Sequence, residues 1–437
     1  SSSDITDFLK KGLCYHLSME ALHMKIMILG HGAKELAALK ALEETGEHQV
    51  HALPSNSAST VFESALCETP IVAEDYEQIP AAARQYEPDL ILVMDEEVRR
   101  QPVIKELKDM GYPVFAPTDQ AAAQLYTRQK WTSLFRRENL PVPASRQFIT
   151  KDEILEYIQT GNGPWVLNLM GQPKMFHICF SEEEVQDVLD QWFVYTDAAD
   201  VLVTDYLDGI RFNIFGMVHE DHLIPFGSAI IQRGVYEQED DGEMKGLGAF
   251  SPADAVPQEV RQKAAEEILT PFVKALHEDG SSYTGFLNGE FVYHDGKLIC
   301  TNVKAGLPDC GSVAAIMRLK SDLAKIASEL MKGNVLSAER SRSSAAVIVL
   351  TPNEYPSAPH RESSICVDED FEGILLPHHM TIHPDGSMSS LQGRTAFVAA
   401  MGRTRKEACA KALEACRHIS SEDLFYRTDI GKLISEQ

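Results

Sequence analysis

The chain has 437 residues, a length that predicts about three domains. Its 40 Lys and Arg residues stand against 65 Asp and Glu, and the resulting formal charge of −25 disfavours binding to nucleic acid or to an anionic membrane surface. A charged fraction of 24% beside 44% hydrophobic residues is ordinary globular composition and excludes disorder as the main state.

The first segment, residues 1–23, mixes charged and apolar residues and has no apolar block typical of a signal peptide. We interpret it as an extension without an assigned function. No run of 18 apolar residues occurs elsewhere in the sequence. The sequence therefore predicts a cytoplasmic protein.

Apolar runs alternate with helical patterns over residues 24–125. Strands are expected at 25–29, 50–53, 89–94 and 113–117, with helices at 33–44 and 102–110. This alternation predicts an N-terminal parallel α/β domain. Gly30-His31-Gly32 lies between the first strand and its helix, where backbone N–H groups can favour an anion, but it lacks the third glycine of a dinucleotide motif.

A helix over 119–140 and a break at Pro141-Val142-Pro143 follow, so residues 126–145 are interpreted as a linker helix. Short strands at 165–167, 176–180, 201–204 and 212–215, with a helix at 182–192, predict a small α+β module over 146–215.

The second half of the chain predicts two further domains, 216–340 and 341–437. The first is expected to contain a strand at 224–231, a helix at 258–277 and a hairpin of 285–292 with 297–302. The second is expected to contain strands at 345–350 and 394–400, a hairpin around 383–386, and a helix that begins with a Thr404/Glu407 capping box.

Two pairs of residues are candidate metal ligands by their spacing. Residues two apart on a strand share a face, so a carboxylate at position 300 with Asn302 would suit Mg²⁺, but position 300 is a cysteine, a poor ligand for this ion. His378 and His379 are adjacent, and on a strand they would point to opposite faces, which favours a structural role. Eight scattered cysteines without a C-x-x-C motif indicate packing residues instead of a zinc or disulfide framework.

Several segments, in order from about residue 24 to 432, resemble the glycinamide ribonucleotide synthetase (phosphoribosylamine–glycine ligase) family of ATP-grasp enzymes. The segments that carry the resemblance are Met24 to Glu35, Pro113 to Thr118 with Ala121 to Leu125, Tyr206 to Gly209, Gly246 to Pro252, Tyr283 to Gly285, Leu319 to Leu323, Gly393-Arg394, and Phe425 to Gly431.

The resemblance implies an ATP-grasp fold of class α/β: an N-terminal parallel α/β domain (24–125), a lid (146–215), a central ATP-grasp domain (216–340) and a C-terminal α+β domain (341–437). It implies ATP and Mg²⁺ as cofactors, and glycine and phosphoribosylamine as substrates. In the implied reaction, ATP phosphorylates the glycine carboxylate and the amine of phosphoribosylamine attacks the acyl phosphate. The implied roles are catalysis for Lys304; nucleotide binding for Lys174, Asp205, Leu207 and Asn168; substrate binding for Gly30, Gly32, Lys34, Glu35, Asn56 and Asp309; and metal binding for Asn302.

The sequence also departs from the family pattern at charged positions. Asn168 stands where the resemblance calls for a lysine that reaches the nucleotide phosphates, Cys300 replaces a glutamate of the metal pair, and Arg211 replaces an acidic residue. Lys34 replaces an arginine and Leu307 an aspartate. Loss of such charges removes transition-state stabilisation. Two hypotheses therefore remain open: a ligase with impaired or altered activity, and a non-catalytic binding or regulatory protein that keeps the scaffold and has a protein partner.

Overall fold

The computed structural model describes residues 23–30, 32–46, 48–53, 76–161, 163–170, 175–234, 245–356, 362–383, 385–391 and 393–432. Residues 1–22 of the expected extension, the expected nucleotide ligand Lys174, and the expected substrate ligand Asn56 lie outside these ranges. Within the described ranges, no helix is both long and apolar enough to cross a bilayer.

The N-terminal part is a four-stranded parallel sheet, as the sequence predicts, and its strands are in the order β2-β1-β3-β4. Its strands are β1 (Lys25–Leu29), β2 (Gln49–Leu53), β3 (Leu90–Val93) and β4 (Val114–Phe115). The helices are α2 (Ala33–Thr45), η2 (Tyr76–Gln78), α3 (Ile79–Tyr86), α4 (Glu96–Arg99) and α5 (Val103–Asp109). β3 is apolar throughout, and β1 is apolar after Lys25, because a parallel sheet is covered on both faces.

The single helix expected over 119–140 is broken. The chain forms α6 (Asp119–Ala122), η3 (Ala123–Leu125) and α7 (Arg128–Arg137). The break falls at Thr127, which is extended, next to Tyr126, whose hydroxyl donates to Asp119 and accepts from Arg99. These side-chain contacts hold the chain in a turn that the apolar pattern alone does not reveal.

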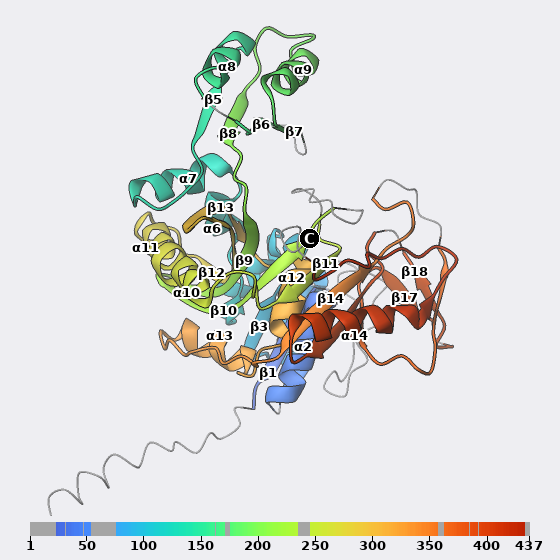
Figure 1. The fold of residues 1–437 in the computed structure, drawn as a ribbon. Coiled ribbons are helices and arrows are strands. Elements are labelled where there is room, and N and C mark those ends of the chain that lie inside the picture. The colour runs from blue at the N-terminus through green and yellow to red at the C-terminus, as the bar shows by residue number, and fades with distance from the viewer. Residues whose placement is uncertain are drawn as a thin grey trace, which may run out of the picture.

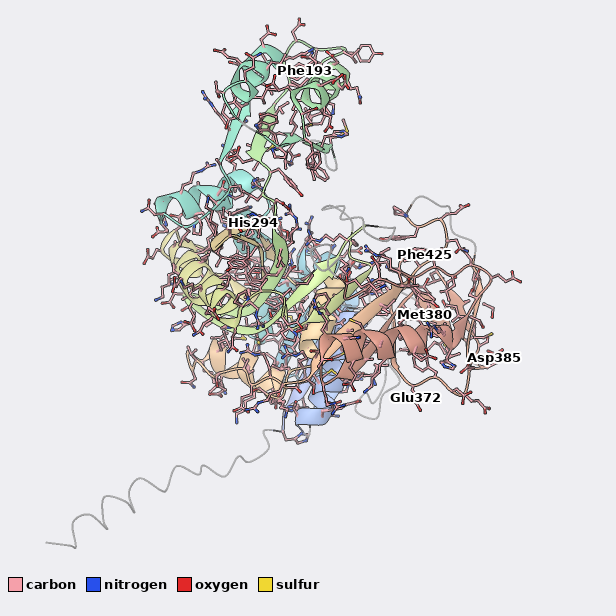
Figure 2. All side chains as sticks on the ribbon, in the orientation of Figure 1. Phe193, His294, Glu372, Met380, Asp385 and Phe425 are labelled. Carbon is pink, nitrogen blue, oxygen red and sulfur yellow. The ribbon has the colours of Figure 1, made fainter. Side chains whose placement is uncertain are left out.

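The lid is a separate four-stranded antiparallel sheet in the order β5-β8-β6-β7, with two helices on one face (Figure 1). Its elements are β5 (Ser145–Phe148), α8 (Lys151–Ile158), β6 (Trp165–Leu169), β7 (Phe176–Cys179), α9 (Glu182–Trp192) and β8 (Val201–Asp205). β5 and α8 were not predicted, although Thr150 and Glu153 form a complete capping box at the start of α8. Figure 2 shows Phe193 at the far end of the lid.

The expectation that residues 212–215 belong to the lid is wrong. They lie within β9 (Ile210–His219), which pairs with β10 (His222–Gln232) and β12 (Thr284–His294) in the large sheet. The lid sheet therefore ends at Asp205, and the expected boundary between residues 215 and 216 falls inside a strand of the body.

The large sheet has eight strands in the order β13-β12-β9-β10-β11-β14-β19-β16. The remaining members are β11 (Gly248–Ser251), β13 (Lys297–Ala305), β14 (Ser344–Leu350), β16 (Ile374–Pro377) and β19 (Ala396–Gly402). β11 pairs with β14, so hydrogen bonds of one sheet cross the expected boundary between residues 340 and 341.

A small sheet and six helical segments complete the body. The sheet has the order β17-β18-β15-β20, formed by β15 (Ser364–Val367), β17 (Met380–Ile382), β18 (Met388–Ser390) and β20 (Ile419–Ser420). The helical segments are α10 (Gln258–Lys263), the π-helical η4 (Ala264–Leu269), α11 (Thr270–Glu278), α12 (Asp309–Ile316), α13 (Leu323–Met331) and α14 (Arg405–Arg417).

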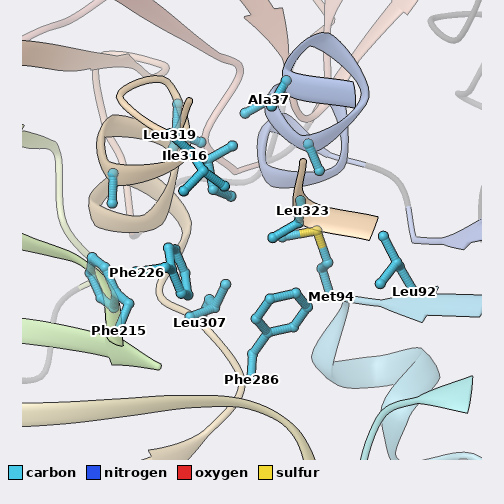
Figure 3. Close-up of a cluster of buried hydrophobic side chains, with 14 of the residues drawn as sticks. Ala37, Leu92, Met94, Phe215, Phe226, Phe286, Leu307, Ile316, Leu319 and Leu323 are labelled. Atoms are coloured by element: carbon cyan, nitrogen blue, oxygen red, sulfur yellow. The ribbon is translucent and has the colours of Figure 1, made fainter. Parts of the chain in front are cut away.

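One hydrophobic core joins the N-terminal part to the large sheet. In Figure 3, Ala37 of α2 lies beside Ile316 and Leu319, while Phe215, Phe226 and Phe286 come from the strands of the large sheet. The same core includes Leu92 and Met94, at the end of β3. The lid has a hydrophobic core of its own, separate from those of the body.

Candidate functional site

A pocket of about 1020 Å³ lies where α2, the end of β3, the β12–β13 hairpin and the segment after β16 meet. Its charged lining comprises six cations and five acids: Lys34, Arg100, Arg233, Lys245, Lys304 and Arg394 against Asp95, Glu96, Glu97, Glu290 and Asp309. In a protein with a formal charge of −25, this balance makes the pocket locally cationic. Among the described residues of the lid, none lines it.

The turn between β1 and α2 is compact because two glycines permit it. Gly30 has a φ of +131°, and a Cβ there would lie 2.6 Å from Glu35 Oε1. A Cβ on Gly32 would lie 2.7 Å from His378 Nδ1. The first N–H of α2, that of Ala33, donates to the same His378 nitrogen at 3.3 Å. The N-terminus of α2, where the sequence predicts that an anion could bind, is thus hydrogen-bonded to a side chain of the C-terminal part.

Glu35, an expected substrate ligand, is 1% exposed and does not line the pocket. Its Oε1 has no hydrogen-bond partner in the described part of the chain. Burial raises the pKa of the carboxyl to about 8, helped by Asp95 and opposed by Lys34. At neutral pH Glu35 is therefore mainly a protonated acid.

Asp309 and Lys34, also expected to bind substrate, bind each other. Lys34 Nζ lies 3.0 Å from Asp309 Oδ1 and donates to the carbonyls of Met94 and Leu307. Arg394 donates to the other carboxylate oxygen of Asp309. Burial alone would raise the pKa of Asp309, but Lys34 and Arg394 hold it well below its usual range. The carboxylate therefore stays ionised between two buried cations.

His378 and His379 do not point to opposite faces as expected. Both line the pocket, with ring centroids 4.6 Å apart, because they lie in the turn between β16 and β17 and not on a strand. Burial lowers the pKa of His378 well below its usual value, so its ring is neutral. No group of three His, Cys, Asp or Glu side chains that could hold a metal ion occurs within the described ranges.

The hairpin of β12 and β13 brings two predicted site residues to the pocket: Asn302, predicted to bind a metal, and Lys304, predicted to be catalytic. Glu290 of β12 is the register partner of Asn302, so the two side chains share a face. Lys304 Nζ lies 3.1 Å from Glu290 Oε1, and Arg233 Nη2 lies 3.2 Å from the same oxygen. Burial acts to raise the pKa of Glu290, but the attraction of Arg233 and Lys304 lowers this pKa to about 2.

The expectation that Cys300 shares a face with Asn302 is wrong. The register runs Phe291 with Cys300 and Glu290 with Asn302, so Thr301 is an extra residue in β13. This bulge reverses the alternation of β13 side chains between the core and the pocket. Cys300 is fully buried in the core with Phe291, and its thiol donates to the Asn302 carbonyl.

The lid and hinge hold the residues expected to bind nucleotide. Asn168 lies on β6, whose neighbouring Leu167 is in the lid core, so Asn168 lies on the sheet face away from α8 and α9. Asp205, at the end of β8, is exposed. The Leu207 carbonyl accepts from Arg211 Nη2 at 3.2 Å, and the Arg211 guanidinium lies over the Tyr206 ring.

The donors around Asn302 do not suit a divalent cation of the kind that the resemblance implies. Mg²⁺ prefers oxygen ligands, above all carboxylates. The thiol of Cys300 is in the core, and Glu290 is already held between Arg233 and Lys304, whose charges repel a metal ion. Only the amide of Asn302 remains of the expected pair.

Glu290 and Arg233 line the pocket but were not among the predicted site residues. Counting back from the turn after His294 pairs Glu290 with Thr301, and only the bulge brings it opposite Asn302. Arg233 follows the last residue of β10 and lines the pocket, and its backbone carbonyl accepts a hydrogen bond from Arg427 at 3.0 Å. The hairpin turn could have placed Glu290 next to β13, although with a register wrong by one residue.

Three family models match the chain in succession. They are the phosphoribosylglycinamide synthetase N domain over residues 24–125, the ATP-grasp (A) domain over 127–310, and the C domain over 345–433. The chain is 28% identical to phosphoribosylamine–glycine ligase of Vibrio parahaemolyticus over 423 residues, which cover 93% of this chain and 98% of that one. It is 29% identical to the Rhizobium meliloti protein of the same name, with the same coverage.

Solved structures agree on the fold. Phosphoribosylamine–glycine ligase of Thermotoga maritima matches with a TM-score of 0.74 and 20% identity, over 93% of this chain and 99% of that one. A biotin carboxylase from Campylobacter jejuni matches with a TM-score of 0.66 and 14% identity, over 93% and 94% of the two chains. The arrangement of N-terminal α/β domain, lid and large sheet is therefore common to both kinds of protein.

Proposed function

The chain belongs to the phosphoribosylglycinamide synthetase family and has the ATP-grasp fold, and from this membership we propose that it is a ligase-like protein with impaired ATP-dependent turnover. Its substrates would be those in the names of its relatives, glycine and phosphoribosylamine, and its place the cytoplasm. The reaction class is ligation of a carboxylate to an amine through an acyl phosphate.

The proposal is supported most by the difference between the pocket, which keeps charged and polar side chains, and the lid, which has few cations. Lys34, Lys304, Asn302 and Asp309 all line one pocket, which favours retained binding of small ligands. On the lid, Asn168 offers no positive charge, and residues 146–205 contain three Lys or Arg against eleven Asp or Glu. A lid of this charge repels the polyphosphate of a nucleotide.

The direct test is release of ADP from ATP in the presence of Mg²⁺, glycine and phosphoribosylamine, with the Vibrio parahaemolyticus ligase assayed in parallel. Loss of one charge-stabilising group typically lowers kcat by about 10²–10³, so we expect kcat/KM to be lower by at least that factor. A rate equal to that of the Vibrio enzyme would contradict the proposed impairment.

A variant tests the cause of the impairment. Asn168→Lys restores a cation on the lid face away from the helices, so we expect it to lower the Kd of ATP in calorimetry by about tenfold. Thr160→Lys adds the same charge at an exposed position just after α8 and is the matched control. Equal effects of both variants would mean that only the overall lid charge matters.

The second candidate is a non-catalytic binding or regulatory protein on the same scaffold, which would act through a protein partner. It is favoured by Cys300, whose thiol is packed in the core where the resemblance calls for a metal-binding carboxylate. Absence of heat on titration with Mg·ATP, together with retained binding of a substrate, would select this candidate. ADP release that depends on both glycine and phosphoribosylamine would exclude it.

A further inference from the structure

Two buried carboxylates in the pocket each hold two cations. Glu290 is contacted by Lys304 at 3.1 Å and Arg233 at 3.2 Å, and Asp309 is contacted by Lys34 at 3.0 Å and by Arg394. The carboxylates of both groups are ionised, so each group has one positive charge in excess. Such paired groups are suited to an anion, which adds the negative charge that each lacks.

The group around Glu290 lies where the resemblance calls for a metal ion. Glu290 is directly opposite Asn302 across β12 and β13, and its Oε1 is the atom that contacts both Lys304 and Arg233. Asn288 Nδ2 lies 3.5 Å from the same oxygen. Lys304 and Arg233 are therefore anchored from one side, and the Lys304 ammonium, which has three N–H groups, keeps donors for a ligand in the pocket.

The backbone of Arg233 is held in place as well as its side chain. Arg427 donates to the carbonyls of Arg233 and Gly234, at 3.0 and 3.2 Å, and forms a buried ion pair with Asp429. Arg427 is 2% exposed. A cation whose backbone and side chain are both held loses little conformational freedom when it binds a ligand.

We propose that Glu290 positions Lys304 and Arg233 as a metal-free anion site, which binds the phosphate group of a nucleotide or a sugar phosphate directly. This inference deepens the proposed function, on whose pocket it rests, and it assigns to two side chains the charge neutralisation that a divalent cation would supply. Glu290 is a positioning residue in this arrangement and does not touch the ligand.

The first experiment uses the full chain and titrates it by calorimetry with ADP and with ribose 5-phosphate, each in EDTA and in excess MgCl₂. We expect at least one probe to bind with a Kd that differs by less than about threefold between the two conditions. The probe that binds identifies the source of the phosphate. A Kd at least about tenfold lower with Mg²⁺, or no binding of either probe in EDTA, would overturn the proposal.

Failure of the proposed function is distinguishable from failure of this inference. Absence of ADP release in the ligase assay leaves the calorimetric titration in EDTA unaffected. Conversely, a strictly Mg²⁺-dependent Kd overturns the metal-free site even if ligase activity is present.

A second experiment compares two cations of the same pocket. Lys304→Met removes an anchored cation, whereas Lys245→Met removes an exposed one that is not a partner of Glu290 in the structure. We expect the Kd of the bound probe to rise by about tenfold or more for Lys304→Met and by less than about threefold for Lys245→Met. Equal losses would mean that the pocket attracts anions only by its overall charge, and would overturn the positioning role.

The role of Glu290 itself is tested by shortening it. Glu290→Asp keeps the charge and withdraws the carboxylate by one methylene, so we expect it to weaken probe binding while the far-UV spectrum is unchanged. Glu290→Gln adds one positive charge to the pocket. Tighter binding in Glu290→Gln with unaltered binding in Glu290→Asp would show that Glu290 only reduces the local charge, and would contradict positioning. The titration of the unaltered chain in EDTA decides the proposal if a variant fails to fold.

Discussion

At the scale of single residues, Glu35 is the clearest departure from ordinary protein chemistry. It is a carboxylic acid in the first turn of α2, 1% exposed, with one oxygen that has no hydrogen-bond partner in the part of the chain described. Burial of a carboxylate without full compensation is expensive, so the side chain takes up a proton instead. The raised pKa of about 8 places this ionisation in the physiological range.

Glu35 should therefore make the fold less stable as the pH rises. The pKa of the carboxyl is about 8 when folded and near 4.5 when unfolded, so unfolding releases a proton between these values and is favoured by higher pH. We expect Glu35→Gln, which mimics the protonated acid, to raise Tm at pH 8 and to have little effect at pH 4.5. Scanning calorimetry at both pH values measures the difference. Glu44→Gln, at the exposed end of the same helix, is the control, and an equal gain in both variants would contradict the assignment.

At the scale of elements, one extra residue in β13 decides what the hairpin can do. Without the bulge at Thr301, Cys300 and Asn302 would share the pocket face, as period-two alternation predicts. With it, Cys300 and Val303 both enter the core, three residues apart, while Asn302 and Lys304 face the pocket. Position 300, where the resemblance calls for a carboxylate, is therefore a core position in this chain.

A glutamate at position 300 should not create a metal site in this protein. Cys300→Glu would bury a charge among apolar side chains and is expected to reduce the free energy of unfolding by about 3 kcal/mol or more. Cys300→Ala removes only the thiol and should reduce it by about 1–2 kcal/mol. Urea denaturation followed by circular dichroism measures both. A stable Cys300→Glu protein that gains Mg²⁺ affinity would show that the side chain reaches the pocket.

At the scale of the whole molecule, Asp309 connects three parts of the chain. It begins α12 of the central part, and its two cations come from α2 of the N-terminal part and from Arg394, just before β19 of the C-terminal part. The large sheet and the core around α2 and α12 connect the same parts through apolar contacts. The lid has a separate core and takes no part in these contacts.

Removal of the Asp309 carboxylate should destabilise the body of the protein. Asp309→Ala leaves Lys34 and Arg394 buried without their common partner, and breaking a buried ion pair in this way typically costs about 3–5 kcal/mol. Asp279→Ala, which breaks the exposed pair with Arg137, is the matched control and should cost less than about 1 kcal/mol. Urea denaturation compares the two, and equal values would mean that Asp309 does not connect the parts as described.

Much of the fold follows from local pattern. The parallel N-terminal strands, the β12–β13 hairpin and the start of α14 at Thr404 were predictable because alternation, turn residues and capping act over a few residues. The break at Thr127 and the membership of β9 in the large sheet were not predictable in this way. Both depend on contacts with residues far along the chain, such as Arg99 for the turn and β12 for the strand.

The sequence by itself determined the class of fold, the family resemblance and the absence of a lid cation at Asn168, since these are properties of residue type and order. Only the tertiary structure decided that Cys300 faces the core, that His378 and His379 both reach the pocket, and that Glu290 lies opposite Asn302. The physical reason is that register, bulges and ion pairs are set by distances between segments remote in sequence. The sequence specifies which charged residues are present, and the folded structure decides which of them form ion pairs.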